Sequence, residues 1–284
     1  MPEFVLRDAG GTLRVQGWRQ EAARRAAALL LELAREGKTR AEVIDFDGGR
    51  AYLKASRLRG SAAWRHALHR LHARPVPRVQ EYQNLAWLAE RHFATPAPLA
   101  AGVLVSKGLP RFHALLTEHL PGTRTLEETL EDGRERGKAD LLDELAREVA
   151  RMHALGFVHH DLFARNVLVR PGGEGQLGRR LVFLDCWAGG PPTPLRARGP
   201  AYDLACLLLD VGELAGAGEA RFLERYFHER AAQGRPAPVS ATRASLARAR
   251  RALRRRLVRE PRRLRGRPLP SAGPGLVFAR IRES

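Results

Sequence analysis

Residues 159–166 have the sequence HHDLFARN, and this short stretch decides how the rest of the chain is interpreted. It places a carboxylate, Asp161, five residues before an amide, Asn166, in the spacing H-x-D-x-x-x-x-N. The residues before it, Ala139–Leu155, carry apolar side chains at helical spacing and are followed by Gly156, so they predict an amphipathic helix with a glycine stop. The sequence therefore predicts a polar loop directly after a long helix.

A second acidic position follows the loop at the end of an apolar run. Val167–Val169 and Leu181–Leu184 are predicted strands joined by the turn-rich Pro171–Arg180, and Asp185 ends the second strand. Asn166 directly precedes the first of these strands, and Asp185 follows the second. An amide and a carboxylate both carry oxygen atoms of the kind that Mg²⁺ binds.

A lysine upstream is the third candidate. Glu42–Phe46 and Arg50–Ala55 predict a hairpin around an Asp-Gly turn, and Lys54 lies on its second strand. The chain holds 49 lysines and arginines, of which only four are lysines, so a lysine here is unusual. A compact ammonium suits a single phosphate contact, and arginine is not an equivalent replacement.

The helix predicted at Arg78–Arg91 carries two acids that could pair with this lysine, Glu81 and, at the helix end, the less favoured Glu90. Each feature also has a plain structural explanation, since Asp185 could cap a turn and Lys54 could be a surface residue. The order of the features favours a functional site. Phosphoryl transfer needs a carboxylate that orients a hydroxyl, oxygen ligands for Mg²⁺ and a cation on the phosphates, and the chain offers all three.

The loop HHDLFARN resembles the catalytic loop of protein kinases and their small-molecule relatives. The resemblance implies an ATP-dependent phosphotransferase that uses Mg²⁺, with an α+β, protein-kinase-like two-lobed fold. The small β-rich N-terminal lobe would be residues 1–118 and the larger, mainly helical C-terminal lobe residues 119–284. The implied site residues are the catalytic base Asp161, the metal ligands Asn166 and Asp185, the phosphate-binding Lys54, its partner Glu81, and Glu118 at the hinge that meets adenine.

Within that superfamily, four stretches resemble the bacterial lipopolysaccharide kinases that phosphorylate heptose or Kdo of the inner core. They are HHDLFARNVLV, FLDCW, LLTEHLPGTRTLEE and AYDLACLLLD. The resemblance implies a lipid-linked sugar acceptor, the lipopolysaccharide core, and a peripheral location at the cytoplasmic face of the inner membrane. It also implies that Asp203 braces the catalytic loop, although an acid in the first turn of a helix is equally explained by the helix dipole.

The chain departs from the protein-kinase pattern in several places. No G-x-G-x-x-G precedes Lys54, and Cys186-Trp187 replace the Phe-Gly that follows the metal-binding aspartate. His160 replaces an arginine of regulated kinases, and Arg165 is the cation offered near the catalytic aspartate. These departures disfavour protein substrates and leave a degenerate kinase scaffold as an alternative.

The composition adds a formal charge of +18 and a pI near 11.3, which favour a polyanionic partner. The segment Arg243–Arg267 predicts a basic amphipathic helix, followed by further arginines, that lies on an anionic membrane, packs its leucines on the protein core, or does both. Aromatic residues are 6% of the chain, and no aromatic-interleaved motif favours nucleic acid. A small-molecule phosphotransferase of the aminoglycoside or choline type stays open, and the arginines disfavour its cationic substrates.

Two further expectations follow from the composition. Only two cysteines are present, so a disulfide framework is not expected. No apolar run approaches the roughly 20 residues that span a bilayer, and the N-terminus lacks the pattern of a secretory signal. The oligomeric state is not indicated by the sequence.

Overall fold

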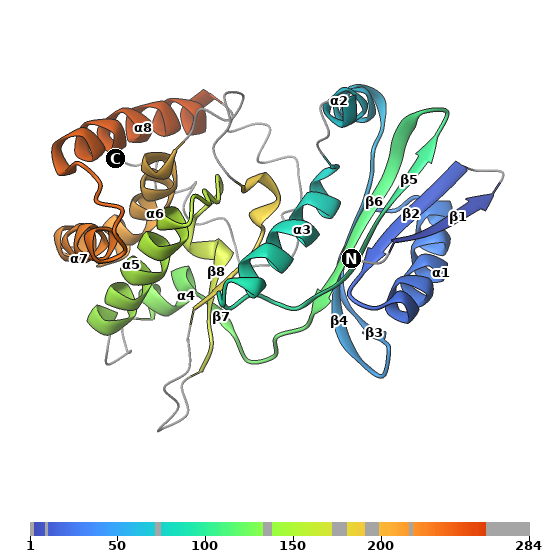
Figure 1. Ribbon diagram of the computed structural model, residues 1–284, viewed down its shortest axis with the longest axis horizontal. Coiled ribbons are helices and arrows are strands. Elements are labelled where there is room, and N and C mark those ends of the chain that lie inside the picture. Colours follow the sequence, from blue (N-terminus) through green and yellow to red (C-terminus); the bar gives the residue numbers. More distant parts are fainter. Residues whose placement is uncertain are drawn as a thin grey trace. The chain divides into compact units, whose positions relative to one another are not determined.

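The computed structural model describes residues 3–8, 11–71, 75–132, 138–171, 181–190, 199–215 and 218–259. The chain forms two compact units (Figure 1). The first unit is Met1–Pro121 together with Asp185–Ala188, and the second is Gly122–Leu184 together with Gly189–Ser284. Nucleotide binding by residues 1–118 and catalysis by residues 119–284 stay predictions.

The first unit is built on an antiparallel six-stranded sheet with the strand order β1-β2-β5-β6-β4-β3. Its strands are β1 (Glu3–Asp8), β2 (Gly11–Gly17), β3 (Arg40–Phe46), β4 (Gly49–Arg57), β5 (Pro98–Ser106) and β6 (Leu109–Glu118). The helices of this unit are α1 (Gln20–Glu36), α2 (Gly60–Leu71) and α3 (Pro77–Glu90), and Cys186–Ala188 forms the short 3₁₀ helix η2.

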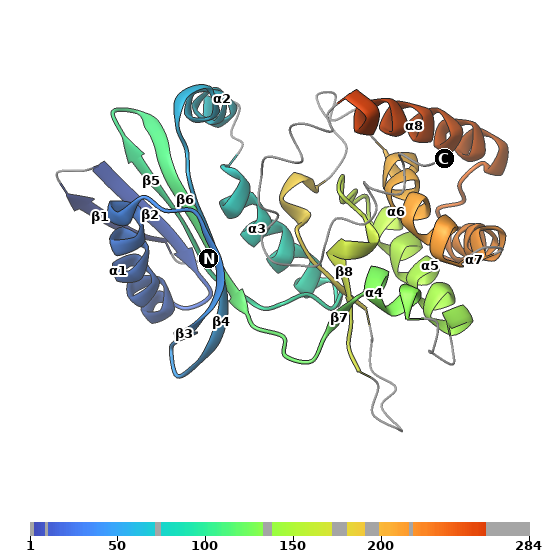
Figure 2. The same cartoon turned by 180° about the vertical axis from the view of Figure 1, so that it is seen from behind.

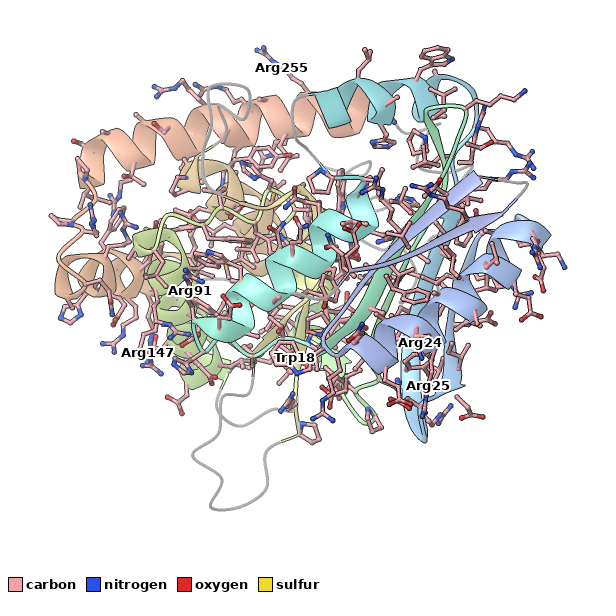
Figure 3. All side chains as sticks on the ribbon, turned by 45° about the vertical axis from the view of Figure 1, so that its right-hand side comes forward. Trp18, Arg24, Arg25, Arg91, Arg147 and Arg255 are labelled. Carbon is pink, nitrogen blue, oxygen red and sulfur yellow. The ribbon has the colours of Figure 1, made fainter. Side chains whose placement is uncertain are left out.

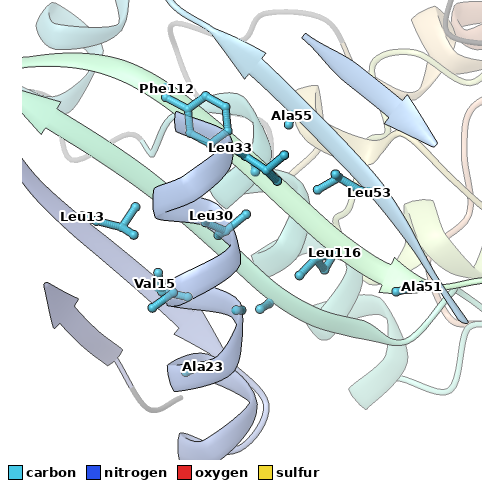
Figure 4. Close-up of a cluster of buried hydrophobic side chains, with 14 residues drawn as sticks. Leu13, Val15, Ala23, Leu30, Leu33, Ala51, Leu53, Ala55, Phe112 and Leu116 are labelled. Atoms are coloured by element: carbon cyan, nitrogen blue, oxygen red, sulfur yellow. The ribbon is translucent and has the colours of Figure 1, made fainter. Parts of the chain in front are cut away.

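Helices α1 and α3 cover opposite faces of this sheet (Figure 1, Figure 2). The side chains of strand β4 alternate between the two faces of the sheet, so β4 contributes to the packing on both. Ala51, Leu53 and Ala55 are buried in a hydrophobic cluster with residues of α1 (Figure 4). Lys54 lies between them in the sequence and therefore points to the other face, which α3 covers.

Two backbone details fix this unit. Asp47 and Gly48 have φ of 55° and 79°, so β3 and β4 are joined by the tight Asp-Gly turn that the sequence predicts. At Gly102 on β5 an added Cβ would lie 2.8 Å from a Leu30 methyl of α1 and 3.2 Å from a Val15 methyl. A larger residue there would push α1 away from the sheet.

The second unit contains a small antiparallel sheet and a set of helices. The sheet has the order β7-β8-β9, with β7 (Arg124–Thr125), β8 (Val167–Val169) and β9 (Leu181–Phe183). The helices are α4 (Leu126–Glu131), α5 (Lys138–Ala154), η1 (Ala164–Asn166), α6 (Pro200–Ala215), α7 (Gly218–Ala232) and α8 (Val239–Arg259). Helix α5 packs against α7, and α6 packs against α4, α7 and α8.

The sequence left open whether the basic helix packs its leucines on the protein core, and helix α8 shows this packing. Leu246 and Leu253 are each 4% exposed, and Leu253 packs with Phe163 and Cys206 of the second unit. These two leucines of the basic helix therefore face the protein core, while Arg251, Arg254 and Arg255 are exposed. The remainder of Arg243–Arg267, residues 260–267, lies outside the described residues.

The elements predicted from the sequence are confirmed, with ends that shift by a few residues. The hairpin, the helices around Glu81 and before the loop, and the strands on either side of Pro171–Arg180 are all present. Strands β1, β2, β5 and β7 and helices α2, α4 and α7 were not predicted. Cys186 and Cys206 are free and buried, as expected.

The topology explains why the sequence has no glycine-rich turn before Lys54. Strand β3 is the outer neighbour of β4 at one edge of the sheet, and the chain enters β3 from helix α1 through Gly37. No strand-to-strand turn therefore leads into β3.

Within the described segments, no helix combines the length and the apolar character that crossing a bilayer requires.

Candidate active site

Lys54 on β4 lies between two carboxylates of the first unit. Its Nζ is 2.9 Å from Oε1 of Glu81 on α3 and 2.5 Å from Oδ1 of Asp185. The side chains of Lys54 and Glu81 are 13% and 1% exposed, so the pair is largely removed from water. The sequence prediction that Glu81 rather than Glu90 pairs with this lysine is confirmed, since Glu90 is mostly exposed.

The charges in this cluster keep one another ionised. Burial alone would lower the pKa of Lys54, but the negative charges of Glu81 and Asp185 outweigh it and hold that pKa well above its ordinary value. Burial would raise the pKa of Asp185, but the positive charges of Lys54 and Arg78 hold it well below its usual range. Asp185 is therefore a carboxylate at neutral pH.

Arg78 is a member of this cluster that the sequence did not predict. Its Nη1 donates to Oε2 of Glu81 at 2.7 Å and lies 3.7 Å from Oδ1 of Asp185. It precedes Glu81 by three residues on α3, which places both side chains on one face of the helix. The cluster thus contains two cations and two carboxylates.

Helix α3 is anchored to the segment that carries Asp185. Nδ2 of Asn84 donates to the carbonyl oxygen of Cys186 at 2.6 Å, and Asn84 is buried. Asp185 itself has φ of 53°, a left-handed conformation that aspartate tolerates better than most residues. The contact between α3 and residues 186–188 fixes the backbone beside the carboxylate.

The loop of residues 159–166 is held by Asp203 within the second unit. Asp203 is fully buried in the first turn of α6, and its two carboxylate oxygens accept the backbone N–H groups of His159 at 2.6 Å and His160 at 2.7 Å. His160 has φ of 64°, so its backbone requires such support. The prediction that Asp203 braces the loop is confirmed.

His153 and Tyr226 form further contacts that hold the carboxylate of Asp203 in place. Nε2 of His153 lies 3.2 Å from Oδ2 of Asp203, and Nδ1 lies 2.9 Å from the hydroxyl of Tyr226 on α7. With a proton on Nε2, His153 donates to the carboxylate and accepts from Tyr226. Burial raises the pKa of Asp203, but the hydrogen bonds from His153 and from the backbone of His159 leave that pKa below its ordinary value.

The loop positions Asp161 and Asn166 together. Nδ2 of Asn166 donates to the backbone carbonyl of Asp161 at 2.7 Å and lies 3.4 Å from Oδ2 of the same residue. Arg165 lies with its guanidinium over the ring of Phe163 at 4.2 Å, and its Nη2 is 3.9 Å from Oδ1 of Asp161. A carboxylate with a neighbouring cation therefore stands in the loop, as the sequence predicts.

His159 connects the loop to the strand that precedes Asp185. Its Nε2 lies 2.8 Å from the carbonyl oxygen of Leu184, and the N–H of Leu184 donates to the carbonyl of Asn166 at 2.9 Å. These two contacts hold Leu184, the last residue of this part of the second unit, against the loop. The meeting of Lys54 and Asp185 with Asp161 and Asn166 at one site stays a prediction.

The residues offered as Mg²⁺ ligands have suitable atoms. Asp185 is ionised, and the amide nitrogen of Asn166 is occupied by Asp161, so the amide oxygen is the atom that Asn166 can offer a cation. One carboxylate and one amide oxygen suit a magnesium ion that takes its other ligands from water and phosphates. The donor set therefore fits the predicted metal.

Glu118 ends strand β6, and its side chain is exposed. Its N–H donates to the carbonyl of Ala97 at 2.9 Å, and its Oε2 accepts the N–H of Ala97 at 3.2 Å. These contacts tie the end of β6 to the start of β5. The predicted adenine contact of its backbone stays a prediction.

The positive charge of the chain is spread over several elements. Figure 3 labels arginines on α1, α5 and α8 and at the end of α3, namely Arg24, Arg25, Arg147, Arg255 and Arg91. No single helix therefore accounts for the +18 charge.

Comparison with known proteins places these observations in one family. The lipopolysaccharide kinase (Kdo/WaaP) family profile matches residues 63–226, which include Glu81, Asp161, Asn166, Asp185 and Asp203. Lys54 lies before the matched range.

Curated relatives include enzymes named 3-deoxy-D-manno-octulosonic acid kinase. The one from Xanthomonas campestris pv. campestris (strain B100) is 35% identical over 97 residues, which are 34% of this chain and 37% of the relative. The one from Xanthomonas oryzae pv. oryzae (strain PXO99A) is 32% identical over 144 residues, which are 50% of this chain and 56% of the relative. The chain thus matches less than two thirds of either relative.

Among solved structures, a glucosamine kinase aligns with a TM-score of 0.53 at 16% identity, and the alignment covers 91% of this chain and 88% of the other. At that identity the likeness shows the fold alone. The fold is α+β and protein-kinase-like, as the sequence predicts.

Proposed function

Because the chain belongs to the lipopolysaccharide kinase (Kdo/WaaP) family, we propose that it transfers the γ-phosphoryl group of ATP to a hydroxyl of an inner-core sugar, Kdo or heptose. The observation that carries the proposal is the ion cluster in which Lys54 is held between Glu81 and Asp185. These side chains come from distant parts of the sequence. A lysine held in this way is a fixed cation for a phosphate group.

In the first unit, Lys54 binds the ATP phosphates, and Glu81 keeps its side chain in one position. Arg78 adds a second cation beside the same carboxylates. Backbone groups near Glu118 meet the adenine ring. The absence of a glycine-rich turn before β3 makes these side-chain cations more important for holding the phosphates.

In the second unit, Asp161 accepts the hydrogen bond of the acceptor hydroxyl and orients it for attack. Asn166 of this unit and Asp185 of the first unit would hold Mg²⁺, which would neutralise charge on the phosphates. Arg165, stacked on Phe163, supplies positive charge close to Asp161. Asp203 positions the loop and does not take part in the chemistry.

The acceptor is attached to lipid, so we propose that the protein works at the cytoplasmic face of the inner membrane. Leu246 and Leu253 of α8 are buried, so attachment would rest on exposed arginines such as Arg251, Arg254 and Arg255. Binding through charge weakens with salt. Sedimentation with phosphatidylglycerol vesicles should therefore fall with added NaCl and with Arg→Gln changes at these three positions, and salt-independent binding would contradict it.

The test of activity is phosphate transfer from Mg-ATP to defined core oligosaccharides that carry Kdo or heptose, followed by mass spectrometry. Asp161→Asn should lower the transfer rate at least about 100-fold, the range in which general bases contribute. The control is Asp140→Asn, an exposed acid in the first turn of α5, which should keep full activity.

Transfer that survives in Asp161→Asn would rule out Asp161 as the base. Phosphorylation of an aminoglycoside or choline, but of no core sugar, would favour the small-molecule alternative. A folded protein that transfers phosphate to none of these acceptors would favour the degenerate scaffold.

A further inference from the structure

A pocket of about 620 Å³ lies within the second unit, between the start of α6, the end of α7 and one face of α8. Its volume is in the range of pockets that bind small organic molecules. It is lined by Tyr202 and Tyr226, by the hydroxyl residues Thr242 and Ser245, and by Arg230 and Arg248. The described lining contains two arginines and no acidic residue, so its charged side chains are all positive.

Arg230 is the unusual member of this lining. Its Nε and Nη1 are buried and make no hydrogen bond within the described part of the chain. An arginine in the last turn of a helix is ordinarily explained by the helix dipole or by a bond to a free carbonyl. Arg230 occupies the last turn of α7, yet these two nitrogens bind no carbonyl. Buried donors without acceptors are costly, which points to an external acceptor.

The surrounding groups suit an anion attached to a polar body. Residues 199–202, at the N-terminal end of α6, line the same pocket, and the amino end of a helix carries partial positive charge. Arg248 lies one turn from Ser245 on α8 and donates to its hydroxyl at 2.9 Å. Hydroxyl groups and tyrosine rings are the usual partners of sugar hydroxyls and sugar faces.

We propose that this pocket binds a phosphorylated saccharide, with the phosphate ester on Arg230 and Arg248 and the sugar against Tyr202, Thr242 and Ser245. The phosphate has two conceivable sources, a free sugar phosphate or a phosphate already carried by the lipopolysaccharide core. Both present the same monoester to the guanidinium groups. The residues that would contact the saccharide lie on α6, α7 and α8, and none of them is a residue assigned to phosphoryl transfer.

The test is direct binding to the full chain by isothermal titration calorimetry, without ATP or magnesium. One arm uses glucose 6-phosphate and the other a phosphorylated core oligosaccharide, with glucose and inorganic phosphate as reference probes. At least one phosphorylated sugar should bind, and more tightly than either reference. Because no transfer is measured, failure here is distinguishable from failure of the proposed kinase activity.

Two arginine variants give the matched comparison. Arg230→Gln should weaken binding about tenfold or more, because glutamine cannot make a charge-assisted hydrogen bond to the phosphate. Arg255→Gln removes the same charge from an exposed position on α8 that does not line the pocket, and it should leave binding unchanged (Figure 3). Thermal unfolding measurements check that both variants are folded. Arg248→Gln changes the other arginine of the pocket, which is exposed, and it should also weaken binding of the phosphorylated sugar.

Binding of either phosphorylated sugar that depends on Arg230 and not on Arg255 supports the proposal, and the arm that binds identifies the source of the phosphate. Equal losses in the Arg230 and Arg255 variants would show a non-specific charge effect and overturn it. Inorganic phosphate that binds as tightly as the phosphate esters would overturn the assignment of a saccharide. The proposal would also be overturned if neither glucose 6-phosphate nor the phosphorylated core oligosaccharide binds.

Discussion

Replacing Asp203 with asparagine tests whether a buried carboxylate holds the loop of residues 159–166. Asparagine has nearly the same size, but it offers one acceptor oxygen and one NH₂ donor in place of two acceptor oxygens. The carboxylate accepts from the backbone N–H groups of His159 and His160 and from His153. In any orientation of the amide, at least one of these donors therefore faces another donor.

The magnitude follows from the hydrogen bonds that each substitution removes. A hydrogen bond to a charged group contributes about 1.5–3 kcal/mol, so Asp203→Asn should lower the free energy of unfolding by about 2 kcal/mol. Asp203→Ala removes every acceptor oxygen of the side chain, and its cost should approach the roughly 3–5 kcal/mol of a broken buried ion pair. Asp140→Asn changes a first-turn acid that is exposed, and it should cost no more than about 1 kcal/mol.

The effect also has a defined pH dependence. The pKa of Asp203 is lower in the folded protein than its ordinary value, so the unfolded chain binds the proton more readily. The contribution of Asp203 is therefore complete above the ordinary pKa of about 4 and is lost as the pH falls through the folded value. The stability gap between the wild type and Asp203→Asn should narrow as the pH is lowered from 7 toward 3.

Urea unfolding at several pH values measures the gap, and hydrogen exchange at the amides of His159 and His160 reports the loop itself. Both amides should exchange faster in Asp203→Asn. The reasoning is refuted if Asp203→Asn costs no more than Asp140→Asn, if the gap widens toward acid pH, or if both amides keep their protection.

Three further predictions concern stability. Glu81→Gln should lower the free energy of unfolding by about 3 kcal/mol because it breaks a buried ion pair, whereas Glu90→Gln on the same helix should change it little; equal urea midpoints would contradict this. Arg78→Met should cost about 2 kcal/mol because its hydrogen bond to a buried carboxylate is removed, and an unchanged midpoint would show that Arg78 is dispensable to the cluster. Leu253→Ala should cost about 2–5 kcal/mol and Arg255→Ala less than about 0.5, as measured by thermal unfolding; similar values would mean that α8 does not pack on the core.

The sequence predicted the parts of the candidate site that depend on rare residue types or on order along the chain. Lys54 stood out because the chain uses arginine almost everywhere else, and Asp185 stood out because it ends an apolar strand. Glu81 was preferred over Glu90 because of its place in the helix, and the structure pairs it with Lys54. The sequence left two explanations for Asp203, an interaction with the helix dipole and support of the loop. Its hydrogen bonds to the backbone of His159 and His160 favour support of the loop.

Arg78 was missed for the opposite reason. In a chain with so many arginines, one more carries no signal until its neighbours are known. Its spacing of three residues from Glu81 was the clue that could have found it.

Strand β5 was missed because Pro98, Ala100, Ala101 and Gly102 give its first half little of the β-branched character expected of a strand, although β5 lies inside the sheet. Pairing with β2 and β6 decides its conformation, and pairing between distant segments cannot be read from local sequence.

The division of the chain at Asp185 has a consequence for any attempt to separate the two units. The polypeptide passes from one unit to the other after Pro121, after Leu184 and again after Ala188. A fragment that stops at Pro121 would keep Lys54 and Arg78 but would have Glu81 as their one remaining carboxylate. Such a fragment would carry an uncompensated positive charge in its interior, so the gene cannot be split at a single point into two self-sufficient halves.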